Sequence, residues 1–146
     1  MKDDNQALKI LLVVAVSAVL LWVFLARDNS DIGICRFAFG GLVKGNISAQ
    51  GSIDWDRLKA LDADVGAYFS KLPNEKEKAT YKSAFIKSFA NGFKNSGGNL
   101  GEFANWRVES EAGTKITVVA ADYRGKTLLF SLPKQGARKI IVIQWK

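Results

Sequence analysis

The chain has 146 residues, a formal net charge of +7, no histidine and one cysteine. The missing histidine excludes Ser-His-Asp and Cys-His catalytic triads, His-ligated haem and nearly all zinc catalytic sites. One cysteine excludes an internal disulfide and an iron–sulfur ligand set, and no glycine-rich phosphate-binding loop is present. We therefore predict a protein that is not an enzyme and that uses no metal or other cofactor.

An uncharged apolar run near the start is the strongest single signal. Residues 10–26 carry no charge and lie between Lys9 and Arg27. As a helix they would span roughly 26 Å, close to the thickness of a bilayer core. The preceding residues are not basic overall, and no small-x-small site closes the run, so a cleaved signal peptide is disfavoured. We predict an uncleaved signal anchor, with a short N-terminal tail and a single-pass transmembrane helix in residues 1–27. Its representative residues are Ile10, Leu20, Trp22 and Phe24.

The orientation of this anchor in the membrane is predicted from the charged residues on its two sides and from the lengths of the segments that they belong to. Lysines and arginines are nearly balanced on the two sides, and a short tail before a long domain most often leaves the domain outside the cytoplasm. We therefore predict a membrane protein whose soluble domain is extracytoplasmic, in the periplasm or an equivalent compartment. The run itself has no ionisable side chain, which is typical of a passive anchor.

Two helical patterns follow the anchor. Residues 28–53 form a juxtamembrane segment, in which residues 34–46 fit a short helix that either stands alone or belongs to the soluble domain. That domain covers residues 54–146. Apolar residues recur at helical spacing from Trp55 to Leu72, and Pro73 prevents continuation. The acids near residue 54 are interpreted as helix caps.

A second helix is predicted to begin after Asn74, because Glu77 completes a capping box. Aromatic residues then step by four along the helix. Packing against a sheet is the ordinary interpretation of such a stripe, and the lining of an apolar pocket is the alternative. The candidate pocket residues are Tyr81, Phe85, Phe89 and Trp106.

From Phe103 the apolar period changes from helical spacing to two, which is typical of strands. Four strands are predicted, around Trp106, in residues 116–123, in residues 128–132 and in residues 140–145. Arg124-Gly125 is predicted as a tight hairpin turn. The last strand is apolar on both faces, so one face requires a cover from residues 30–45, a partner or lipid. The expected fold class is thus α+β: a transmembrane helix, then two or three helices packed on a four-stranded antiparallel meander.

The excess positive charge is concentrated in residues 113–146, where seven basic residues face a single acid, Asp122. Such residues are either solvated lysines and arginines at turns and edges or a surface that meets a polyanion. Other protein subunits and anionic lipid are the expected partners of this surface, and no nucleic acid is expected. The candidate partner surface consists of Ile141, Ile143, Trp145, Arg124, Lys126, Lys134, Arg138 and Lys139.

The order of these elements resembles the nuclear-transport-factor-type, cystatin-like cone fold. The resemblance covers about residues 34–146 and depends on two stretches before the strands, Phe39-Gly-Gly-Leu-Val-Lys-Gly-Asn46 and Asp54-Trp-Asp-Arg-Leu-Lys-Ala-Leu61. The four closing strands agree with it in character. The pocket His and Asp pairs of that superfamily's enzymes have no counterpart here, so the resemblance implies no catalysis. Its membrane-anchored members are similar to assembly subunits of secretion and conjugation machines.

Together these observations predict a non-catalytic, membrane-anchored accessory or assembly subunit of a larger membrane protein complex. It would bind its partners through an extracytoplasmic α+β domain. The alternative is a membrane-tethered carrier that binds a small apolar ligand or lipid in the pocket between helices and sheet. Stoichiometric co-purification of another protein distinguishes the first function from the second.

Overall fold

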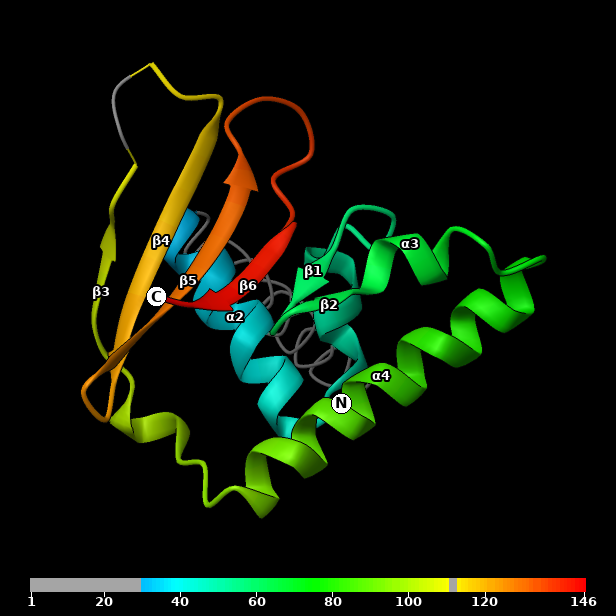
Figure 1. Cartoon of the computed structure of the whole chain (residues 1–146), viewed down its shortest axis with the longest axis horizontal. Helices are drawn as coiled ribbons and strands as arrows, with labels where there is room; N and C mark the ends of the chain where they lie inside the picture. Colours follow the sequence, from blue (N-terminus) through cyan, green and yellow to red (C-terminus); the bar gives the residue numbers. More distant parts are fainter. Residues whose placement is uncertain (1–29, 111–112) are drawn as a thin grey trace, which may run out of the picture.

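The computed structural model describes residues 30–110 and 113–146 as helices packed against a mixed β-sheet (Figure 1). Short 3₁₀ helices and two very short strands separate the longer elements. In chain order the elements are α2 (Asp31–Lys44), η1 (Ile47–Ser52), β1 (Lys59–Ala60), β2 (Ala63–Asp64), α3 (Val65–Phe69), α4 (Glu75–Asn95), η2 (Leu100–Glu102), β3 (Ala104–Val108), β4 (Ile116–Tyr123), β5 (Lys126–Pro133) and β6 (Val142–Trp145).

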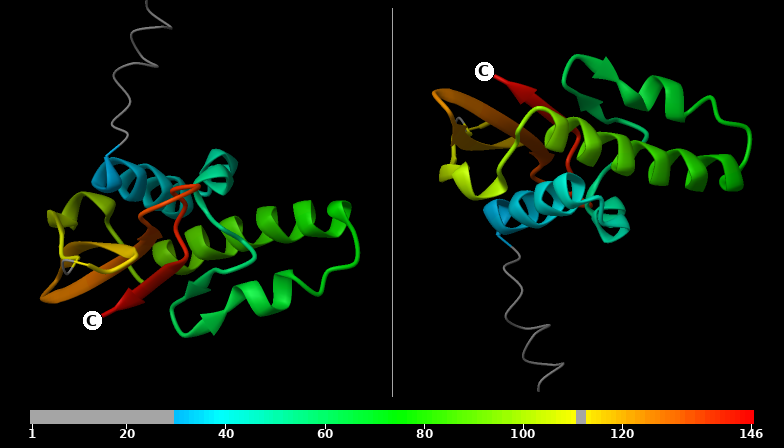
Figure 2. Two further views of the ribbon diagram at one scale, coloured as in Figure 1. Left: turned by 90° about the horizontal axis from the view of Figure 1, so that it is seen from above. Right: turned by 90° about the horizontal axis from the view of Figure 1, so that it is seen from below.

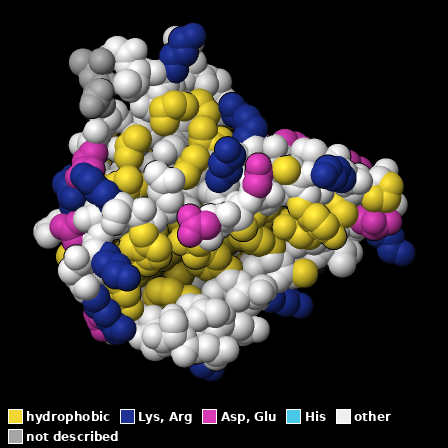
Figure 3. Space-filling model, in the orientation of Figure 1, with side chains coloured by type: hydrophobic (Ala, Val, Ile, Leu, Met, Phe, Trp, Pro, Cys, Tyr) yellow, Lys and Arg dark blue, Asp and Glu magenta, His cyan; other side chains and the backbone are white. Residues whose placement is uncertain are grey.

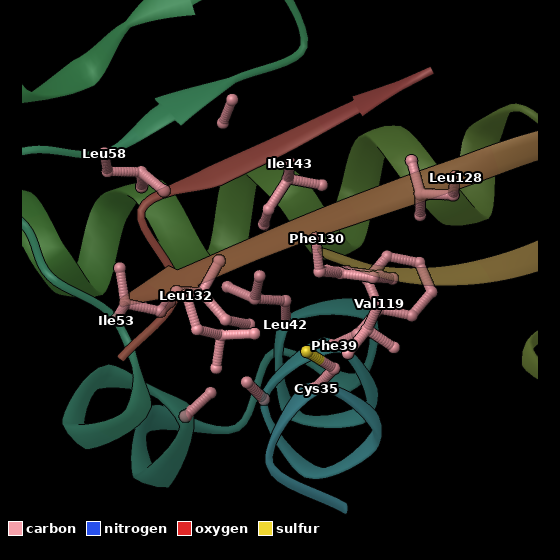
Figure 4. Close-up of a cluster of buried hydrophobic side chains, with 14 of the residues drawn as sticks. Cys35, Phe39, Leu42, Ile53, Leu58, Val119, Leu128, Phe130, Leu132 and Ile143 are labelled. Carbon is pink, nitrogen blue, oxygen red and sulfur yellow. The ribbon is translucent and has the colours of Figure 1, made fainter. Parts of the chain in front are cut away.

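Helix α2 has defined caps at both ends. The Ser30 side chain accepts a hydrogen bond from the Gly33 amide at 3.0 Å, and Gly45 ends the helix in the left-handed conformation. The side chains of Cys35, Ala38, Phe39 and Leu42 are buried. They belong to the same hydrophobic core as the strands, so α2 packs directly on the inner face of the sheet (Figure 4).

The sheet has the strand order β2-β1-β6-β5-β4-β3, and β1 runs parallel to β6 while every other neighbouring pair is antiparallel. The predicted four-stranded antiparallel meander is therefore wrong. The amides of Lys59 and Leu61 donate to the carbonyls of Ile141 and Ile143 at 2.9 and 2.8 Å, so the chain around β1 occupies the far edge of β6. Strands of two residues have no period to read, which is why the sequence pattern did not reveal them.

The predicted helix from Trp55 to Leu72 is also wrong. Apolar residues do recur at helical spacing in this stretch. However, Leu61 and Asp62 adopt positive φ angles of 48° and 72°, which reverse the chain between β1 and β2. Only α3 remains helical in this stretch. The Asp64 side chain caps it by accepting from the Ala67 amide at 3.0 Å. Backbone pairing with β6 thus overrode the local preference for a helix.

The prediction of a single-pass membrane protein with an extracytoplasmic domain is corrected by the helices themselves. Between residues 30 and 146, leaving out 111 and 112, no helix is both long and apolar enough to cross a membrane. The longest of these helices, α4, has 21 residues but carries charged side chains along much of its length. The predicted anchor residues Ile10, Leu20, Trp22 and Phe24 lie outside the described residues.

The core lies between the inner face of the sheet and α2. Alternate residues of β5, Leu128, Phe130 and Leu132, point inward and are almost fully buried (Figure 4). The Phe39 ring meets the Phe130 ring edge-on at 5.4 Å. Helix α4 runs past α2, and its N-terminal half extends with α3 beyond the sheet (Figure 2). Among the residues that the structure describes, large side chains of this part, such as Tyr68, are exposed.

Candidate functional site

An open apolar cavity of about 280 Å³ lies between the C-terminal half of α4 and strands β5 and β6. Ser96 supplies the only hydroxyl of the lining, and its Oγ donates to the Phe93 carbonyl at 2.8 Å. Among the described residues, no side chain of the lining carries a charge. The cavity is therefore suited to apolar groups, which need no hydrogen-bond partner. Its lining consists of Phe39, Leu61, Phe89, Gly92, Phe93, Ser96, Phe103, Leu128, Ile143 and Trp145.

The start of α4 fixes which of its residues face the cavity. The Asn74 side chain accepts from the Glu77 amide at 2.9 Å and donates to Glu77 Oε1 at 3.1 Å. The helix thus begins at Asn74 with the predicted N-cap, while Glu77 accepts from the Asn74 side chain and not from its backbone amide, as a capping box would require. From this start, residues that step by four lie on one side of the helix, so Phe89 and Phe93 turn toward the sheet.

The cavity is held open by rings that pack on one another. Phe39 of α2 lies at the centre, with ring centroids 6.2 Å from those of Phe89 and Phe93 and 4.8 Å from that of Phe103. Gly92 leaves a gap in the wall, because a Cβ atom at this position would meet nothing within 4 Å. The rigid rings define the walls, and the missing side chain opens the space between them.

The cavity continues along α4 as a groove. A second hollow of about 190 Å³ shares Leu61 and Phe89 with the first and adds Ala60, Phe85 and Ser88. Figure 3 shows the corresponding band of apolar side chains between α4 and the strands. We call this surface the α4 groove, and define it by Leu61, Phe85, Ser88, Phe89, Gly92, Phe93 and Trp145.

The four residues predicted to line a pocket lie in different places. Phe89 lines both hollows of the α4 groove, and Phe85 lines the second. Tyr81 lies further along α4, with its ring 5.1 Å from that of Tyr68, and burial raises the pKa of its hydroxyl. Trp106 is not among the lining residues, because its ring stacks on Phe130 at 5.6 Å.

The apolar residues of the predicted partner surface are partly occupied within the fold. Ile143 is fully buried and forms part of the cavity wall. Ile141 is half-buried, and its amide donates to Ser131 while its carbonyl accepts from Lys59. Trp145 is 43% exposed and lines the cavity. The apolar last strand thus meets β1 on one edge and the cavity on one face.

The basic residues of that surface fall into two groups. Arg124 pairs with Glu102 and also donates to the Gly97 carbonyl at 3.1 Å, and Arg138 pairs with Asp31. The ion pairs of these two arginines link parts of the chain that are distant in sequence. Lys126 and Lys134 are exposed and Lys139 is half-buried, and none of the three has an ion-pair partner in residues 30–110 and 113–146.

The Glu102–Arg124 pair predicts a pH-dependent contribution to stability. The hydrogen bond from Arg124 holds the pKa of Glu102 below its ordinary value of 4.5. The stabilisation is therefore fully present above pH 4.5 and is lost as the pH falls through the lower folded-state value. We expect the difference in unfolding free energy between the natural protein and Glu102→Gln to shrink as the pH falls below 4.5, measured by urea denaturation. A difference that stays constant down to the acid limit would contradict this role.

Sequence reasoning missed several lining residues, notably Phe39, Phe103 and Leu128. No local pattern marks them, because they come from three separate elements. A signal did exist on α4 itself: Ser88, Gly92 and Ser96 step by four beside the aromatic stripe. This spacing places the small residues on one side of the helix.

The structure also bears on nucleophilic catalysis and on metal binding. Cys35 is fully buried, and burial, with a smaller contribution from Asp31, raises the pKa of its thiol far above the ordinary value, so it is not a reactive nucleophile. In the described residues, no three His, Cys, Asp or Glu side chains come together as a metal site.

Comparison with known proteins adds no assignment. No protein-family model, no curated protein and no solved structure matches the chain.

Proposed function

We propose that this protein is a non-catalytic carrier that binds an apolar ligand in the cavity between α4 and the sheet. One observation carries the proposal: the cavity walls are almost entirely aromatic and aliphatic, and two of the large lining side chains, Leu61 and Trp145, are 44% and 43% exposed. Such a surface is unfavourable in water and becomes favourable when an apolar ligand covers it. The sequence favoured an accessory subunit first and a carrier second, and the cavity reverses that order.

The expected affinity follows from the apolar surface area that a ligand buries in the cavity. A ligand that buries about 200 Å² of apolar surface gains on the order of 5 kcal/mol, from which the cost of association is subtracted. The walls are packed against one another through Phe39, so little ordering is needed when the ligand enters. Weak to moderate affinity, with release when the ligand reaches an apolar acceptor, is what a carrier requires.

A second function, an interaction subunit that binds another protein, is favoured by one specific observation. Leu61, Tyr68 and Trp145 are large apolar side chains with exposed fractions of 44%, 58% and 43%. Exposed apolar side chains of this size are enriched at protein interfaces. Native mass spectrometry of the full chain separates the two functions, because a carrier would retain a small molecule and an interaction subunit would retain a protein in fixed stoichiometry.

Gly92→Leu tests the carrier function directly. The new side chain would enter open space, since nothing lies within 4 Å of a Cβ atom at Gly92. It would fill the cavity, and it replaces a residue of low helix propensity in α4 by one of high propensity. We expect the affinity for Nile red, a neutral apolar dye, to fall at least about tenfold, as when more than 1.4 kcal/mol of binding free energy is lost.

Gly51→Leu is the matched control. Gly51 also has nothing within 4 Å of an added Cβ atom, and it lies in η1, outside the cavity lining. This variant should bind Nile red as the natural protein does. Equal binding by both variants would show that the dye does not occupy this cavity.

A further inference from the structure

We infer that the ligand is a long-chain fatty acid, with its carboxylate at Lys126 and its alkyl chain in the α4 groove. This assignment depends on the proposed carrier function of the cavity. It adds the chemical class of the ligand and its direction of binding.

The strand register places Lys126 close to the cavity, two residues along β5 from the lining residue Leu128. Lys126 pairs with Tyr123 across the β4–β5 hairpin, and it lies on the same face of β5 as Leu128, two residues on. Leu128 lines the cavity and pairs with Trp145 on β6. The Tyr123 ring stacks on Phe103 at 4.3 Å and lies 6.3 Å from the Trp145 ring. The lysine therefore lies on the face of β5 that forms part of the cavity wall, two residues from Leu128.

The charge of Lys126 is available for a ligand. Lys126 is exposed, and no carboxylate of residues 30–110 and 113–146 pairs with it. Its neighbour Arg124 is already paired with Glu102, and Asp122 is paired with Arg107. Figure 3 shows basic side chains at the end of the apolar band where the β4–β5 hairpin lies. An anionic group beside the cavity matches this free positive charge.

The shape of the groove favours a linear chain over a compact molecule. The two hollows form one path from Trp145 past Leu61 to Phe85. Along α4 the path from Phe93 to Phe85 covers about 12 Å at the helical rise. Ser88 has a small side chain and Gly92 has none, so an alkyl chain has room to lie against α4 along this path. Since the walls carry no charge, the charged end of a ligand has to remain at the rim.

Titration calorimetry with the full-length protein tests the assignment, using palmitate and its neutral analogue hexadecanol. We expect palmitate to bind more tightly than hexadecanol at low salt, and the preference to fall as salt rises. Lys126→Gln should weaken palmitate binding by up to about fivefold, because an exposed ion pair contributes no more than this to an affinity. The same substitution should leave hexadecanol binding unchanged. Lys134→Gln, which removes an exposed lysine in the loop after β5, is the matched control and should bind palmitate normally.

The possible outcomes separate this inference from the carrier function. Equal binding of palmitate and hexadecanol, with no effect of Lys126→Gln, would overturn the fatty acid assignment and leave the carrier function supported. A strong preference for hexadecyl phosphate over palmitate would also overturn it. Binding of none of these molecules, nor of Nile red, would overturn both proposals. Gly92→Leu should abolish the binding of palmitate and hexadecanol alike, which locates both in the α4 groove.

Discussion

Replacing Phe130 by alanine should lower the free energy of unfolding by about 3–5 kcal/mol, a large part of what a domain of this size possesses. The Phe130 side chain is 0% exposed and lies in the middle of β5. Its ring meets Phe39 at 5.4 Å on one side and stacks on Trp106 at 5.6 Å on the other. Truncation would leave a cavity between α2 and the sheet. Urea denaturation followed by circular dichroism measures the loss.

Leu129→Ala is the control for this variant. Leu129 is the next residue of β5, is half-buried, and points to the opposite face of the sheet. We expect it to lose about 1 kcal/mol, because less apolar surface leaves contact there. A loss at Phe130 no larger than the loss at Leu129 would contradict the placement of the core between α2 and the inner face.

Gly66→Ala should destabilise the protein by about 1–3 kcal/mol through overpacking. An added Cβ atom would lie 2.4 Å from the Asp56 carbonyl oxygen and 2.8 Å from its carbon. Both are backbone atoms, so no side chain can rotate away to make room. The Gly66 amide also donates to the Leu58 carbonyl at 2.9 Å, which holds α3 against this segment. Thermal unfolding should show a correspondingly lower midpoint.

Gly51→Ala provides the comparison for Gly66→Ala. Nothing lies within 4 Å of an added Cβ atom there, and the position has no positive φ angle. Alanine restricts the unfolded chain at such a site, so we expect no loss or a gain below about 1 kcal/mol. If the two variants unfold alike, α3 does not pack on the Asp56 backbone as the structure shows.

The sequence by itself determined the elements that depend on local interactions. The Asn74 side chain caps α4, as predicted, because it accepts from the Glu77 amide only three residues further along the chain. The Arg124-Gly125 turn was also predictable, and both residues adopt the positive φ angles, 46° and 77°, that a tight hairpin needs. The pairing of β4 with β5 then follows from that turn. The resemblance to the nuclear-transport-factor-type cone stays a prediction.

The tertiary structure alone decided the edge of the sheet and the α4 groove. The chain from Trp55 to Leu72 has helical spacing, yet β1 pairs with β6 because the backbone of an apolar last strand needs partners on both edges. That pairing brings the exposed Leu61 beside α4 and Trp145. The cavity is thus built from residues of α2, α4, β5, β6 and three connecting segments, which no local pattern joins. The wall on α4 follows a repeat of four that the sequence shows, but the other walls depend on packing between distant segments, for which no short stretch of sequence carries a signal.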